Sequence, residues 1–81
     1  MNVITEEELK LHDREDDLWI AVNGFVYDVT KFLSKHPGSE KPFLCYAGFD
    51  ASDGFNMKHP NIDISLIEEV ILVGELAVNV D

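Results

Sequence analysis

The chain has little of three things that often define a class of protein: cysteine, basic residues and long apolar runs. One cysteine in 81 residues excludes an intrachain disulfide and favours a reducing compartment. Lys and Arg number 6 against 16 Asp and Glu, and the formal charge of −10 argues against nucleic acid as a partner. No apolar run approaches the roughly 20 residues of a membrane span. The N-terminus lacks the basic start and apolar core of a signal peptide. We therefore expect a cytoplasmic protein with no membrane span.

The charge that is present lies in the two ends of the chain. Residues 1–17 and residues 60–81 each sum to −5, whereas residues 18–59 sum to zero. A solvated surface explains this pattern, and so does steering of a partner with a basic patch. The length predicts one domain over residues 1–81. A core of that size is small, so a bound group would add to its stability.

Local signals predict an α+β domain in which a small mixed sheet supports short helices. Thr5 and Glu8 form a capping box that opens a short helix, and an exposed loop follows it. Asn23-Gly24 lies between two β-rich runs and predicts a tight hairpin. The later elements that we expect are a helical turn capped by Thr30, helices over 40–48 and 50–58, an amphipathic helix over 61–71 and a closing strand over 71–76.

The tripeptide Lys-His-Pro occurs twice, and its histidines are His36 and His59. Proline disfavours helical geometry in the preceding residue, so both histidines should lie at the ends of helices or in loops. One interpretation is that both are ordinary surface residues. A second is a zinc site completed by Cys45 and an Asp, although no paired motif such as Cys-x-x-Cys is present. Cys45 lies in an apolar helical stretch, which favours a place in the core.

A third interpretation is haem iron held between the two imidazoles. Haem needs a slot with apolar walls and an axial ligand on each side. Four of the five phenylalanines lie between residues 32 and 55, close to the histidines in sequence. Core packing would also explain these aromatic residues, so the residues by themselves leave all three interpretations open.

The run "DLWIAVNGFVYDVTKFLSKHPGS" resembles the first half of a cytochrome b5 domain. That family shows a strand bearing a Trp, a "VYDVTKF" segment and then His-Pro-Gly-Gly. The segment "TEEELKLH" is similar to the opening helix of the family, and the resemblance spans roughly Thr5 to Leu76. It implies non-covalent haem b with iron bound by His36 and His59. The pocket residues that it implies are Val29, Phe32, Pro37, Phe43, Phe55, Met57, Leu66 and Val70.

The resemblance also implies a function, which is transfer of single electrons rather than catalysis. The donor would be a flavin reductase, the acceptor an enzyme or haem protein, and the carrier a monomer. A module of the same fold that binds haem or a small ligand without electron transfer is the alternative, as is a part of a larger redox enzyme. The sequence departs from the family at Ser39, which replaces a glycine, at Pro60, which follows the second ligand, and in a ligand spacing one residue shorter.

Overall fold

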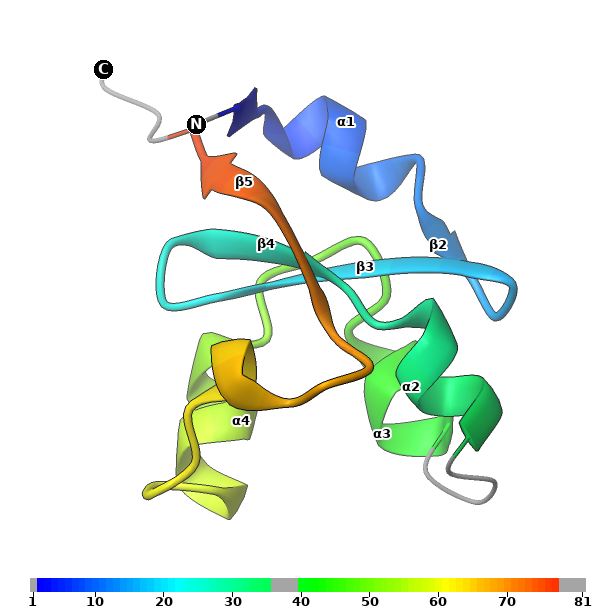
Figure 1. The fold of residues 1–81 in the computed structure, drawn as a ribbon. Coiled ribbons are helices and arrows are strands. Elements are labelled where there is room, and N and C mark those ends of the chain that lie inside the picture. The colour runs from blue at the N-terminus through cyan, green and yellow to red at the C-terminus, as the bar shows by residue number, and fades with distance from the viewer. Residues whose placement is uncertain (1, 36–39, 78–81) are drawn as a thin grey trace.

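The computed structural model of the protein describes residues 2–35 and 40–77. At its centre is a sheet with the strand order β1-β5-β4-β3-β2 (Figure 1). Strands β1 and β5 pair in parallel, and the other neighbours pair antiparallel, so the predicted mixed sheet is confirmed. The strands are β1 (Val3–Ile4), β2 (Asp13–Arg14), β3 (Asp17–Val22), β4 (Phe25–Asp28) and β5 (Ile71–Leu76).

The hairpin between β3 and β4 forms where the sequence predicted it. Asn23 and Gly24 take positive φ values of 52° and 87°, as a two-residue hairpin turn requires. Asn tolerates this region better than other side chains, and Gly has no Cβ to clash. The turn thereby sets the register in which Val22 faces Phe25 and Ile20 faces Tyr27.

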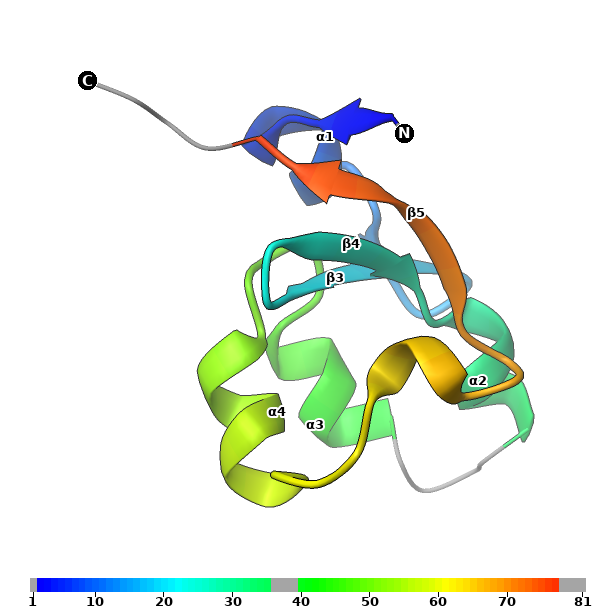
Figure 2. The same ribbon diagram turned by 60° about the vertical axis from the view of Figure 1, so that its left-hand side comes forward.

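Helices cover both faces of the sheet (Figures 1 and 2). Helix α1 (Glu6–Lys10) lies on one face, where Leu9 packs with Ala21 in a small apolar cluster. The apolar cluster on the other face is the larger one, and it includes Leu18, Ile20 and Val22 of β3. The elements on that face are α2 (Thr30–Lys35), α3 (Glu40–Cys45), α4 (Ser52–Lys58) and the short 3-10 helix η1 (Ile64–Leu66).

Two helix starts show how side chains supply the first hydrogen bonds. Thr5 caps α1 as predicted, since its Oγ1 accepts the Glu8 N–H at 3.1 Å. The prediction that Thr30 caps α2 was wrong. Asp28 accepts the Thr30 N–H at 3.0 Å, and the Thr30 hydroxyl oxygen accepts the Leu18 N–H at 3.0 Å instead. Thr30 therefore joins the start of α2 to the sheet.

The predicted helix over 61–71 is also wrong. Asp63 accepts hydrogen bonds from the backbone N–H and hydroxyl of Ser65, and it starts the single turn of η1. From Ile71 onward the backbone pairs with β4, so it cannot also form helical bonds. The apolar spacing that suggested a helix does not mark one buried face, because Ile62 is 50% exposed and Leu66 is 82% exposed.

No signal in the sequence predicted the two short strands near the start of the chain. Val3–Ile4 forms β1 beside the end of β5, and Asp13–Arg14 forms β2 where we expected a loop. Strands of two residues carry almost no periodic signal. Within residues 2–35 and 40–77, the helices are all too short or too polar to cross a membrane.

The positive φ of Gly24 gives a test of the hairpin. An added Cβ would meet no atom within 4 Å, so Gly24→Ala costs only backbone conformational energy. We expect the free energy of unfolding, measured by urea titration, to fall by about 1–2 kcal/mol. Gly24→Asn should lose less, because Asn tolerates the left-handed region. Equal losses in both variants would contradict a backbone origin.

Candidate functional site

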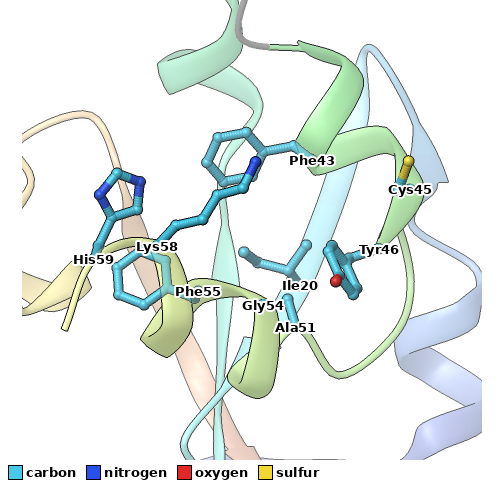
Figure 3. A pocket seen from close by; sticks show the side chains of 9 residues that line it. All are labelled: Ile20, Phe43, Cys45, Tyr46, Ala51, Gly54, Phe55, Lys58 and His59. Carbon is cyan, nitrogen blue, oxygen red and sulfur yellow. The ribbon is translucent and has the colours of Figure 1, made fainter.

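A pocket of about 370 Å³ opens between α3 and α4, over the face of the sheet that carries the larger core (Figure 3). Its wall is mostly apolar, with Ile20 of β3 at its base and Phe43 and Phe55 contributed by the two helices. A concave apolar site with few polar groups is typical of a ligand or cofactor site. The complete lining is Ile20, Phe43, Cys45, Tyr46, Ala51, Gly54, Phe55, Lys58 and His59.

The segment between α3 and α4 is hydrogen bonded directly to the sheet. Ala21 donates its N–H to the Phe49 carbonyl at 3.1 Å, and its own carbonyl accepts the Ala51 N–H at 2.6 Å. Asp50 then accepts the Ser52 N–H at 2.9 Å, so α4 begins one residue beyond the sheet contact. Ala51 holds the N-cap position of α4, while the carboxylate of Asp50 supplies this hydrogen bond from the residue before it. These bonds fix where α4 leaves the sheet.

His59 lies at the open end of this pocket, directly after the last residue of α4. Its N–H donates to the Phe55 carbonyl at 2.8 Å, and its backbone angles of −134° and 63° end the helix. The His59 and Phe55 ring centroids are 5.5 Å apart. Helix α2 likewise ends at Lys35, immediately before His36. His59 thus follows a helix end, as Pro60 predicted, whereas His36 lies outside the described residues.

Gly54 allows α4 to approach the end of α3. A Cβ built on Gly54 would lie 2.5 Å from the hydroxyl oxygen of Tyr46 and 2.8 Å from its Cζ. The phenol ring therefore packs against the helix backbone at the one position without a side chain. Glycine costs a helix about 1 kcal/mol relative to alanine, and this contact explains its place in a helix of seven residues. Tyr46 and Gly54 together shape one wall of the pocket.

The structure places the other predicted pocket residues at different depths. Val29 is fully buried in the main core, and Val70 packs against that core from the turn before β5. Phe32 is half-buried and meets Phe43 edge to face, with 5.3 Å between ring centroids. Met57 and Leu66 are more than 80% exposed, and neither lines this pocket. Pro37, like His36, lies outside the described residues.

Sequence reasoning missed several residues of the pocket. Ile20 was detectable in principle, because β3 alternates and Ile20 shares its inward face with Leu18 and Val22. No local signal marks Tyr46, Ala51 or Gly54, whose place depends on how α3 and α4 meet. Cys45 was predicted to be a core residue and is instead exposed at the pocket edge. Among the described residues, no three His, Cys, Asp or Glu side chains form a group that could hold a metal ion.

Two ionisable groups beside a second cavity, of about 540 Å³, have shifted pKa values. Hydrogen bonds from the Ser65 hydroxyl and backbone N–H lower the pKa of Asp63 below its ordinary value. Burial raises the pKa of Tyr27, and the negative charge of Asp63 raises it further. Both shifts move titration away from neutral pH. Neither group is therefore suited to exchange protons in acid–base catalysis near pH 7.

The fold and pocket define a class of protein: a small α+β domain with an apolar pocket between two helices and an imidazole at its rim. Residues 5–77 match the family described as "Cytochrome b5-like Heme/Steroid binding domain". The chain belongs to this cytochrome b5 family, whose cofactor is haem b and whose members are electron-carrier domains rather than enzymes in their own right.

Solved structures support the same fold over nearly the whole chain. Cytochrome b5 of Ostreococcus tauri virus 2 is 38% identical, with a TM-score of 0.77, over 93% of this chain and 96% of that chain. The cytochrome b558 of Ectothiorhodospira vacuolata is 28% identical, with a TM-score of 0.74, over 94% and 99% of the two chains. The predicted fold class is therefore confirmed.

Curated relatives include larger proteins. Cytochrome b5 reductase 4 of Rattus norvegicus is 43% identical over 75 residues, which cover 93% of this chain. The chain spans only 14% of the length of that relative. The pocket of this chain fits the cofactor of the family, because its walls are apolar and aromatic and an imidazole stands at its rim.

The contact between Tyr46 and Gly54 can be tested by a double-mutant cycle. In a Tyr46→Ala background, Gly54→Ala should raise the free energy of unfolding by about 1 kcal/mol through helix propensity. In the parent the new Cβ would meet the phenol ring, so we expect that gain to be lost or reversed. The measurement is urea denaturation of all four proteins. The same gain in both backgrounds would show that the ring does not restrict this position.

Proposed function

We propose that this domain binds haem b with His36 and His59 as its two axial ligands and carries single electrons between proteins. The observation that carries the proposal is His59 at the rim of an apolar pocket, on a helix end that its backbone hydrogen bond to Phe55 holds in place. His36 would come from the segment after α2, at the other helix end that precedes a Lys-His-Pro histidine.

The side chains of this chain have distinct tasks in that function. The two imidazoles would hold the iron, and two such ligands would leave no free position on it for oxygen or substrate. Phe43, Phe55 and Ile20 exclude water from the pocket, which favours an apolar cofactor. When bound, haem supplies the one-electron chemistry. Met57, Leu66, Phe32, Val29 and Val70 remain proposed contacts of the cofactor, together with Pro37.

We further propose a flavin reductase as electron donor and an enzyme or haem protein as acceptor. Reductases named for cytochrome b5 carry a region similar to this chain, which supports the choice of donor class. The formal charge of −10 favours partners with basic patches and an encounter that weakens with salt. The proposal places the carrier in the cytoplasm as a monomer of one domain over residues 1–81.

The alternative is a module that binds haem or another small ligand without electron transfer. The family description names both haem and steroid as ligands. An imidazole at the rim favours haem, since a steroid offers no metal to bind. A reversible reduction of the bound protein separates the two functions, because only the electron carrier needs it.

Ligation is tested by replacing each histidine in turn. The parent protein should bind haem with a low-spin spectrum and sharp bands on reduction, as two nitrogen ligands produce. His36→Ala and His59→Ala should each lose haem or become high-spin, whereas His12→Ala should keep the low-spin spectrum. His12 is the matched control because it lies beside Trp19, with 3.5 Å between ring centroids, and does not line the pocket. Low-spin spectra in both single variants would refute this ligand pair.

Lys58 offers a test of charge at the pocket. It lines the pocket beside His59, so its ammonium would lie near the haem edge and stabilise the added electron. Lys58→Ala should lower the reduction potential by about 10–30 mV, on a scale where 59 mV is a tenfold change for one electron. Lys35→Ala, beside His36, should act in the same direction.

The control for both lysine variants is Lys31→Ala, which removes the same charge from the exposed first turn of α2. Redox titration at low salt measures all four proteins under conditions in which screening is weak. An unchanged or raised potential in Lys58→Ala and Lys35→Ala would mean that both lysines are ordinary solvated residues.

A further inference from the structure

Helix α4 carries His59 but has little apolar packing of its own. None of its seven residues is buried, and Phe55 and Gly54 are only half-buried. Helices shorter than about 12 residues are marginal in water without tertiary contacts. Glycine inside α4 weakens it further. Apolar packing of α4 against the main core comes from Phe55, and the angle of the helix to the sheet depends on polar contacts as well.

A polar network joins α4 to the turn of the β3–β4 hairpin, which lies on the same side of the molecule (Figure 1). The Asn56 amide donates to Asn23 Oδ1 at 2.8 Å, and the Asn23 amide donates back to Asn56 Oδ1 at 3.3 Å. The Asn23 N–H donates to the Ser52 hydroxyl oxygen at 2.7 Å, and that hydroxyl donates to Asp50 at 2.5 Å. We call Asn23, Asp50, Ser52 and Asn56 the turn clamp.

The turn clamp contacts α4 through two residues that lie one helical turn apart. Ser52 is the first residue of the helix, and Asn56 is four residues later on the same side. Two points of contact fix the rotation of a helix about its axis as well as its position. Asn56 also precedes His59 by three residues, so the rotation of α4 about its axis decides where the imidazole points.

We propose that the reciprocal amide pair of Asn23 and Asn56 is a positioning device for His59. It sets the rotation of α4 against the hairpin turn and so aims the imidazole at the pocket. The proposal rests on the proposed function, in which His59 binds the haem iron. Asn23 and Asn56 are positioning residues, because neither lines the pocket between α3 and α4. The positive φ of Asn23 supports this positioning role, because it directs both the side chain and the backbone N–H of Asn23 toward α4.

The amide pair can be removed from either side. Asn23→Gly keeps the positive φ of the turn and deletes only the side chain. Asn56→Ala deletes the other amide without disfavouring the helix. Asn56→Asp keeps the acceptor for the Asn23 amide and loses the donor, so its effect should be intermediate. Asn61→Ala is the matched control, because Asn61 is exposed and its side chain makes no hydrogen bond with the described residues.

In the haem-loaded protein we expect Asn23→Gly and Asn56→Ala to release haem about fivefold to tenfold faster than the parent, the factor expected when a pair of exposed hydrogen bonds is lost. The double variant should release haem no faster than either single variant, because both remove the same pair. The spread of the low-spin g values, which reports how the axial imidazoles are oriented, should shift in these variants and not in Asn61→Ala. A merely structural role would leave the g values of the folded protein unchanged.

The protein without haem gives an independent measurement. Hydrogen exchange at the His59 N–H, which bonds to the Phe55 carbonyl, should be about fivefold to tenfold faster in Asn56→Ala, while exchange in α2 stays as in the parent. Parent-like exchange, haem release and g values in both single variants would overturn the positioning role and leave the ligation by His59 standing. A parent that shows no low-spin haem spectrum would instead refute the proposed function, and with it a positioning role toward iron.

Discussion

Strand β3 is the element on which the rest of the structure depends, because it packs against other elements on both of its faces and forms hydrogen bonds along both of its edges. Leu18, Ile20 and Val22 face the helices that build the pocket, and Ala21 faces α1. One edge pairs with β4. On the other edge the Trp19 carbonyl accepts the Gly48 N–H at 2.9 Å, and Ala21 bonds to residues 49 and 51. A buried strand must satisfy its backbone groups, and this requirement brings the connection between α3 and α4 onto the sheet.

That connection decides the position of the candidate site. Gly48, with a φ of 74°, turns the chain after α3 toward β3, and α4 starts four residues later. The pocket therefore has its base in Ile20 of the sheet and two walls made of α3 and α4. Phe43 and Phe55 of these helices also pack against the main core.

The walls differ in how they are held. α3 contributes Phe43, which packs with Phe32 against the main core. α4 contributes Phe55, which also packs against that core, and it adds polar contacts to the hairpin turn and the fit of Tyr46 against Gly54. Apolar burial is not directional, whereas hydrogen bonds and close contacts specify an angle. For a residue that must aim an imidazole, angular control is the more relevant property, and this explains why a helix without buried residues can carry His59.

Local chemistry determined several features from the sequence by itself. Asn23-Gly24 specified the hairpin because few residues tolerate positive φ, Thr5 specified the start of α1, and Pro60 placed a helix end before His59. Tertiary structure decided where the predicted helix over 61–71 had to end, because the backbone pairs with β4 from Ile71 onward. It also decided the exposure of Cys45 and the meeting of Tyr46 with Gly54. The reason is the range of the interactions: caps and turns join neighbours in sequence, whereas strand pairing and pocket walls join residues that only the folded chain brings together.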